Sequence, residues 1–191
     1  METNGNEKTA LLIIDMVKDN FVPEKHLPIT EHALRIINPI NKLALRVRDA
    51  GGWVVFSTDA FREDDFIFHG RMRPHALAGT TGAEIIDELD RRPEDLWLPK
   101  PKFSAFFDTD LADQLSDRKI TRCAVAGIAT NFCVLTTVMD AICNDFQAVM
   151  LEDCTAAFTP QIHENTLSLY RRNPLHPLLR VDSSNVLTGE L

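Results

Sequence analysis

Residues 123–134 of this 191-residue chain read CAVAGIATNFCV. The run at 123–126 is short and apolar, as buried strands are, and a helical pattern begins directly after it. The segment therefore predicts a strand that turns into a helix, with Cys133 in the first helical turn. Unpaired backbone N–H groups and the positive end of the helix dipole lower the pKa of a thiol placed there. We expect Cys133 to be a nucleophile for this reason, whereas a cysteine buried elsewhere would be inert.

Compact apolar runs alternate with amphipathic stretches along the rest of the chain. Strands are predicted at 10–14, 53–57, 96–100, 120–126, 148–151 and 178–181. Helices are predicted at 31–50, 83–89, 110–116, 131–144 and 160–171. This alternation is typical of α/β proteins. We expect a single domain over residues 1–191, built as a doubly wound parallel β-sheet flanked by helices in a Rossmann-like, three-layer arrangement.

The composition narrows the class of partner. Hydrophobic residues make up 45% of the chain and charged residues 25%, which are average values for one globular domain. A formal net charge of −8 argues against nucleic acid or an anionic membrane surface, because both require a cationic face. The first nine residues are polar, no stretch is long enough to span a membrane, and the four cysteines lack CxxC spacing. We expect a cytoplasmic protein with reduced thiols that acts on a small molecule.

Three reactive side chains fall at the predicted carboxyl ends of strands, where ligands bind in such sheets. Asp15 follows the first strand, Lys100 ends the third, and Cys133 opens the helix after the fourth. Asp15 would take the thiol proton, Lys100 would stabilise the thiolate, and Cys133 would attack a carbonyl carbon. The N–H groups of Ala129 and Cys133 would receive the oxyanion. Two alternatives remain at this stage: Asp15 as a turn-capping residue, and Lys102 in place of Lys100.

Four segments together resemble the isochorismatase-like superfamily of cysteine hydrolases, which includes nicotinamidases, N-carbamoylsarcosine amidases and ureidoacrylate amidohydrolases. They are LLIIDM at 11–16 with Asp19 close behind, RPHALAGTTG at 73–82, KPKFSAF at 100–106 with TDL at 109–111, and GIATNFCV at 127–134. The resemblance implies a catalytic triad of Asp15, Lys100 and Cys133. It also implies a cis peptide bond between Ile128 and Ala129, and a homo-oligomer, either a dimer or a tetramer.

The cysteine bears on the type of reaction. Isochorismatases hydrolyse a vinyl ether by protonation and need no thiol, so Cys133 favours cleavage of a C–N bond of a small amide or carbamoyl compound through an acyl-cysteine. The alternatives are an isochorismatase-type ether hydrolase and a non-enzymatic binding module that uses its thiol for redox sensing. Asp15 and Lys100 favour the hydrolase, because a sensor needs neither residue.

The long segment at 58–82 predicts a binding loop near the substrate. Asp59, His69 and His75 are of the types that hold a divalent metal such as zinc. Nicotinamidases of the superfamily carry an Asp-x-His pair and two further histidines, but Phe61 stands here in place of the first histidine. We therefore expect no required cofactor, with a metal on Asp59, His69 and His75 as the alternative.

Aromatic side chains are candidates for the wall of an apolar substrate pocket. They are Phe21, Phe61, Phe103 and Phe106, with Phe66 and Phe68 in the same loop as Phe61. Core packing is the alternative role for each of them.

Overall fold

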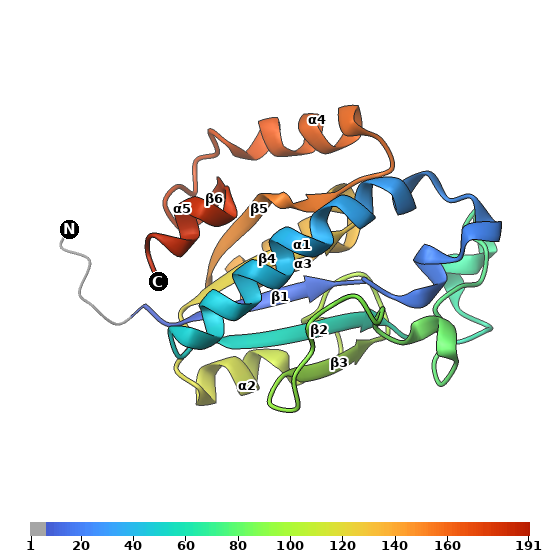
Figure 1. Cartoon of the computed structure of the whole chain (residues 1–191), viewed down its shortest axis with the longest axis horizontal. Coiled ribbons are helices and arrows are strands. Elements are labelled where there is room, and N and C mark those ends of the chain that lie inside the picture. The colour runs from blue at the N-terminus through green and yellow to red at the C-terminus, as the bar shows by residue number, and fades with distance from the viewer. Residues whose placement is uncertain (1–6) are drawn as a thin grey trace.

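A single six-stranded parallel sheet organises the chain in the computed structural model, which describes residues 7–191 (Figure 1). The strand order is β3-β2-β1-β4-β5-β6. The strands are β1 (Thr9–Ile14), β2 (Trp53–Asp59), β3 (Leu96–Lys100), β4 (Arg122–Ile128), β5 (Gln147–Ala156) and β6 (Leu179–Asp182). The predicted α/β class with a doubly wound parallel sheet is confirmed.

Helices cover both faces of this sheet (Figure 1). The helices are α1 (Pro28–Asp49), α2 (Leu111–Asp117), α3 (Leu135–Cys143), α4 (Pro160–Tyr170) and α5 (Ser184–Thr188). One hydrophobic core joins α1 and α5 to one face, and a second joins α2, α3 and α4 to the other. No helix in the described part of the chain is long and apolar enough to cross a membrane.

After their first residues, Thr9 and Arg122, the central strands β1 and β4 carry no polar side chain, because both of their faces are buried. In β1, Leu11 and Ile13 belong to the core under α1, whereas Leu12 and Ile14 belong to the opposite core. Successive side chains of a strand point to opposite faces, so a continuous apolar run supplies both cores at once. This pattern places β1 between β2 and β4 at the centre of the sheet.

Three differences from the sequence-based expectations have local causes. The helix predicted at 83–89 is absent: a 3₁₀ turn at Thr81–Ala83 precedes an extended segment, in which Ile85 forms a β-bridge with Val17. Its apolar spacing instead buries Ile86 and Leu89 against the core under α1. The helix predicted at 131–144 begins with a π-helical turn at Thr130–Val134 before α3, and α5 follows β6, where no helix was predicted.

The long connections after β1 and β2 gather beyond the carboxyl ends of the strands, on the side to which the arrows of β1, β2 and β3 point in Figure 1. Asp19 ties these connections together, since its Oδ2 accepts the N–H of Ala76 at 2.8 Å and its Oδ1 accepts from Lys25 at 2.6 Å. A methyl group added at Gly82 would lie 2.5 Å from the Asp19 carboxylate, so glycine permits this close approach. The loops therefore stand over the edge where the candidate site lies.

Candidate active site

The ends of three neighbouring strands bring one ammonium group and two carboxylates together. Asp59 ends β2 and pairs in register with Lys100, which ends β3, while Asp15 directly follows β1. The Nζ of Lys100 lies 3.0 Å from Asp15 Oδ2, contacts Asp59 Oδ1, and donates to the carbonyl of Lys102 at 3.1 Å. All three side chains are at least nine-tenths buried. Lys100 is thus the lysine at this site, and Lys102 pairs with Asp65 instead.

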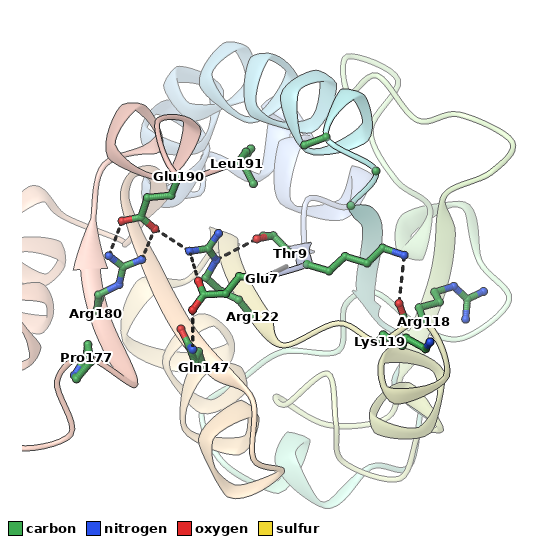
Figure 2. A pocket seen from close by; sticks show the side chains of 14 residues that line it. Glu7, Thr9, Arg118, Lys119, Arg122, Gln147, Pro177, Arg180, Glu190 and Leu191 are labelled. Carbon is green, nitrogen blue, oxygen red and sulfur yellow. Dashed lines mark hydrogen bonds and ion pairs between the residues drawn. The ribbon is translucent and has the colours of Figure 1, made fainter. Parts of the chain in front are cut away.

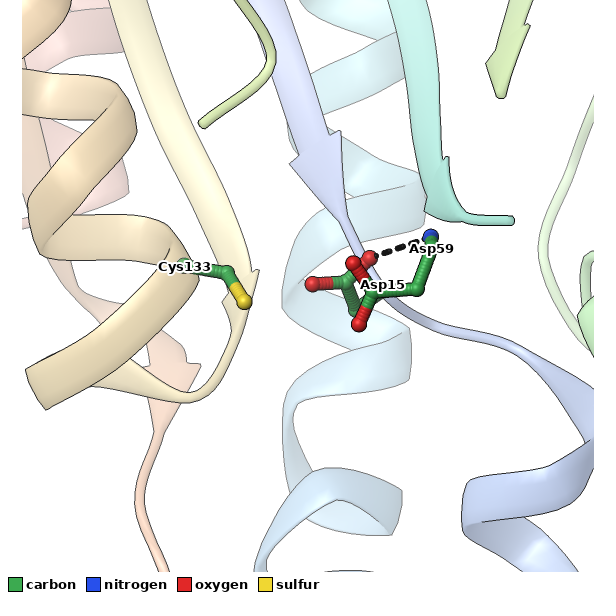
Figure 3. A group of neighbouring side chains, drawn as sticks. All are labelled: Asp15, Asp59 and Cys133. Carbon is green, nitrogen blue, oxygen red and sulfur yellow. Dashed lines mark hydrogen bonds between the residues drawn. The ribbon is translucent and has the colours of Figure 1, made fainter. Parts of the chain in front are cut away.

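Backbone contacts fix the direction of the Asp15 carboxylate. The N–H of Asp59 donates to Asp15 Oδ1 at 2.7 Å (Figure 3). The N–H of Asp15 donates to the carbonyl of Ser57 at 2.9 Å, and the Asn20 side chain donates to the carbonyl of Asp15 at 3.0 Å. Asp15 adopts a positive φ of 53°. This conformation is uncommon for residues other than glycine, and it marks a residue whose orientation the surrounding structure determines.

Cys133 reaches the same point from the other side of β1. It lies in the π-helical turn after β4, and its Sγ points toward the two carboxylates (Figure 3). The Sγ and one carboxylate oxygen from each of Asp15 and Asp59 all lie within 4.8 Å of one another. Cys133 is 7% exposed. The three segments singled out in the sequence thus converge, although Asp15 and Cys133 lie 118 positions apart.

The charges around the thiol act against its ionisation. Burial is the main cause that raises the pKa of Cys133 well above its usual value, and the Asp15 carboxylate raises it further, against the opposing effect of Lys100. This differs from the expectation that the helix start would lower the pKa, because the thiol is buried and also faces the carboxylates. Cys133 therefore rests as a thiol whose nearest proton acceptors are carboxylates.

Lys100 and Asp59 are also perturbed. Burial alone would lower the pKa of Lys100, but Asp15, Cys133 and Asp59 outweigh it, so the pKa is raised and the ammonium form is held. Burial and then Asp15 raise the pKa of Asp59 to about 8, although Lys100 opposes this. Two carboxylates that share one buried cation cannot both lose their protons easily.

The turn that carries Cys133 is held from both ends. The Ile128–Ala129 peptide bond is cis, and the N–H groups of Phe132 and Val134 donate to the carbonyl of Ala129 at 2.9 and 3.3 Å. The side chain of Thr130 is buried and lies 2.9 Å from Nδ1 of His163. The Nε2 of His163 donates to a backbone carbonyl of β5, which leaves Nδ1 to accept the Thr130 hydroxyl.

The residues predicted for a metal do not come together. The carboxylate of Asp59 contacts Lys100, Nδ1 of His75 lies 2.9 Å from the carbonyl of Arg73, and the ring of His69 packs edge-on against Phe66. Within residues 7–191, the cluster of potential metal ligands is Asp15, Asp59 and Cys133. A cation there would compete with the Lys100 ammonium that already bridges the two carboxylates, so these residues do not fit a resident metal.

The four predicted pocket phenylalanines have different surroundings. Phe61 is fully buried and packs against Phe68 and His75. Phe106 stacks on Phe146, with ring centroids 6.1 Å apart, and Phe21 packs on the core under α1. Core packing thus accounts for these three side chains.

The remaining phenylalanine, Phe103, contacts the residue that precedes Cys133. The ring centroid of Phe103 lies 6.2 Å from that of Phe132, the residue before Cys133, and Phe132 is 48% exposed. Phe103 and Phe132 therefore form an aromatic pair whose second member adjoins Cys133 in the chain, and a role for Phe103 in substrate binding stays a prediction.

Sequence reasoning missed three contributors to this site. Asp59 was considered for a metal or a turn and not as a partner of Lys100, although pairing β2 with β3 in parallel register would have aligned them. Phe132, which precedes Cys133 and packs against Phe103, was not considered. His163 lies 33 residues beyond Thr130, and nothing in the local pattern indicates that contact.

Comparison with known proteins identifies the family to which the chain is similar. The model of the Isochorismatase domain family matches residues 9–179. A protein of Arabidopsis thaliana named "Probable inactive nicotinamidase" is 34% identical over 166 residues, which cover 81% of this chain and 84% of that protein. The crystal structure of an isochorismatase-like hydrolase from Alkaliphilus metalliredigens is 31% identical, with a TM-score of 0.82 over 96% of this chain and 98% of that one. The N-carbamoylsarcosine amidase of Thermoplasma acidophilum is 26% identical, with a TM-score of 0.77 over 93% and 97% of the two chains.

Proposed function

The chain belongs to the isochorismatase family of hydrolases, and from this premise we propose that it cleaves a C–N bond of a small amide or carbamoyl compound through an acyl-cysteine. The observation that carries the proposal is the convergence of Asp15, Lys100 and Cys133 at one buried point. A nucleophile, a proton acceptor and a fixed cation within mutual reach are the requirements for covalent acyl transfer.

The proposed reaction begins with proton transfer from Cys133 Sγ to the Asp15 carboxylate as Sγ attacks the carbonyl carbon. Because the resting thiol has a raised pKa, deprotonation and attack are coupled. Lys100 stays an ammonium ion and offsets the negative charge that develops beside the two carboxylates. The oxyanion accepts from the N–H groups of Ala129 and Cys133.

The tetrahedral intermediate then collapses. The C–N bond breaks, the leaving nitrogen takes the proton from Asp15, and ammonia or an amine departs. Water attacks the thioester with Asp15 as the base, which releases the acid and returns the proton to Cys133. No step uses a metal, because the ligand set of Asp59, His69 and His75 is not assembled.

The thiol separates this proposal from the two alternatives. Ether hydrolysis by protonation requires no nucleophile, and it would leave Cys133 without a role. Redox sensing favours an exposed cysteine of low pKa, whereas Cys133 is 7% exposed and its pKa is raised by burial. The amidase named among the solved structures supports a C–N bond as the target. The Arabidopsis thaliana relative is named as a probable inactive nicotinamidase. The test must therefore include amides other than nicotinamide.

The test is a panel of nicotinamide, carbamoyl amino acids and short aliphatic amides, with isochorismate as the ether substrate. We expect ammonia or amine release from at least one amide, and a mass increase on Cys133 equal to the acyl group when turnover is quenched with acid. Cys133→Ala should abolish both signals. Cys143→Ala is the matched control, because Cys143 is the exposed cysteine of α3 and lies outside the site. Undiminished hydrolysis by Cys133→Ala would exclude the covalent route.

We also propose a cytoplasmic location and a homo-oligomeric state, a dimer or tetramer. The four free cysteines support a reducing compartment. The oligomer rests on the family resemblance, and light scattering coupled to gel filtration would test it directly.

A further inference from the structure

A pocket opens at the amino ends of the strands (Figure 2), whereas Cys133 lies beyond their carboxyl ends. Its volume is about 880 Å³, and it lies at the amino ends of four strands, where Thr9, Gly52, Arg122 and Gln147 line it. At about 3.3 Å per residue, the length of β1 separates it from Asp15 by roughly 20 Å. We call it the amino-edge pocket; it is separate from the proposed catalytic centre.

Positive charge dominates the lining of the amino-edge pocket. Five cationic side chains line it, Lys8, Arg118, Lys119, Arg122 and Arg180, against the two carboxylates of Glu7 and Glu190. The whole chain carries a formal net charge of −8, so this surplus of cations is opposite in sign to the protein average.

Arg122 leaves one donor unused at the floor of the pocket. Its side chain is 2% exposed; Nε donates to the Thr9 hydroxyl at 3.0 Å, and Nη1 donates to Glu7 and Glu190 at 3.1 and 2.7 Å. Its Nη2 has no hydrogen-bond partner among residues 7–191. A buried guanidinium donor without an acceptor is destabilising, so this atom marks where an acceptor from a ligand would bind.

The two carboxylates are already compensated. Arg180 donates to both oxygens of Glu190, at 2.7 and 2.6 Å, and also pairs with Asp182 at 3.2 Å. Arg122 holds Glu7. Among residues 7–191, the lining cations without a carboxylate partner are therefore Lys8, Arg118 and Lys119. Figure 2 shows Arg118 and Lys119 on the other side of the pocket from Glu190 and Arg180.

These three cations are partly fixed in place. The guanidinium of Arg118 stacks 3.7 Å from the ring centroid of Trp53, and Lys8 Nζ donates to the Arg118 carbonyl at 3.1 Å. Lys119 follows directly with a positive φ of 58°. The pocket therefore presents one buried guanidinium donor and three flanking positive charges.

We propose that the amino-edge pocket binds a small organic molecule that carries phosphate groups. Arg122 Nη2 donates to one phosphate oxygen, and Lys8, Arg118 and Lys119 neutralise the remaining charge. Arginine donors match the geometry of phosphate oxygens, lysines act as point charges beside them, and the volume is within the usual range for small-molecule sites. This site goes beyond the proposed hydrolase activity and does not depend on it.

The test is isothermal titration of the full-length protein with inorganic pyrophosphate, with citrate as a carboxylate of comparable charge. We expect saturable binding of pyrophosphate that weakens with added salt, and weaker binding of citrate. Binding should persist in the Cys133→Ala variant, which separates this site from the catalytic centre. No saturation at millimolar pyrophosphate, or citrate binding as tight as pyrophosphate, would overturn the proposal.

The variants locate the binding site. Arg118→Gln combined with Lys119→Asn removes two exposed cations of the pocket and leaves the Arg122 network intact; asparagine tolerates the positive φ at 119. The matched control is Arg35→Gln combined with Lys42→Gln, two exposed cations of α1 outside the pocket. We expect affinity about tenfold weaker in the pocket variant and unchanged affinity in the control. Equal affinities in the two double variants would refute the assignment.

A conservative change tests the buried donor itself. Arg122→Lys keeps the positive charge but removes the planar fork that presents Nη2. We expect weaker pyrophosphate binding with the same salt dependence. Unchanged affinity in a folded Arg122→Lys protein would show that Nη2 is not the ligand contact.

Discussion

Replacing Lys100 by methionine tests the charge arrangement of the site most directly. Lys100 is fully buried and is the cation between Asp15 and Asp59, whose side chains are 4% and 8% exposed. Removal of one partner from a buried ion pair costs about 3–5 kcal/mol, because the remaining charge is left uncompensated. Here two carboxylates lose their cation, so we expect a cost in the free energy of unfolding near the upper end of that range at pH 8.

The cost should depend on pH in a defined direction. The folded unmodified protein already holds one proton on Asp59, whose pKa is raised to about 8. Without the ammonium group, we expect the folded variant to hold a further proton on the carboxylate pair at pH values where the unfolded chain, with carboxyl pKa values near 4, has none. The folded state then binds more protons than the unfolded state, so its stability falls as the pH rises. The slope reaches about 1.4 kcal/mol per pH unit for one proton, and the deficit relative to the unmodified protein should shrink from pH 8 to pH 5.

Urea unfolding followed by circular dichroism measures this at each pH, and ammonia release measures activity. Lys102→Met is the matched control, two residues further along and paired with Asp65 at 2.6 Å, but 36% exposed. It should lose about 1 kcal/mol or less, with little change in activity. A deficit for Lys100→Met that stays constant from pH 5 to pH 8, or equal deficits in the two variants, would refute the reasoning.

Three further changes test other parts of the structure. Gly127→Ala should cost at least about 3 kcal/mol of unfolding free energy in a urea titration. The added Cβ would lie 2.1 Å from the Ile14 carbonyl oxygen, and residue 127 has a φ of +101°, which side chains rarely permit. A variant as stable as the unmodified protein would contradict this. Burial lowers the pKa of His163 below 6.5, so the unfolded state takes up a proton first on acidification and is favoured at low pH. The melting temperature of the unmodified protein should therefore fall more steeply below pH 6.5 than that of His163→Gln. Parallel curves for the two proteins would count against the Thr130 contact. Asp19→Ala should lose about 1–3 kcal/mol and expose residues 60–82 to limited proteolysis, since its carboxylate accepts a loop N–H and pairs with a lysine; an unchanged digestion pattern would exclude it as the anchor.

The order of strands and helices could be predicted from the sequence because it depends on local patterns. A buried parallel strand such as β1 is apolar at every position after Thr9, and the glycine pair after α1 marks where that helix ends. The same reasoning failed at 83–89, where the apolar residues pack onto the core from an extended segment. Periodicity reports which residues are buried, and it does not distinguish a short helix from a short extended stretch.

Only the part of the site that lies at the ends of strands could be predicted from the sequence. Asp15, Lys100 and Cys133 follow from the rule that side chains at the carboxyl ends of parallel strands lie together. The pKa of Cys133 could not be predicted in the same way, because it depends on burial and on Asp59, whose contact with Lys100 depends on sheet register. The metal hypothesis rested on residue types, and the contacts of those residues could not be read from their spacing.

The division between central strands and overlying loops has a consequence for how this protein can diversify. The proposed reacting groups stand at the ends of β1 and β3 and in the turn after β4, whereas residues 60–82 form a separate connection that is tied down through Asp19. Substitutions in those loops can reshape what is admitted without disturbing the acid, the ammonium or the sulfur. Substrate specificity can thus change through the loops alone, while the chemical step stays the same.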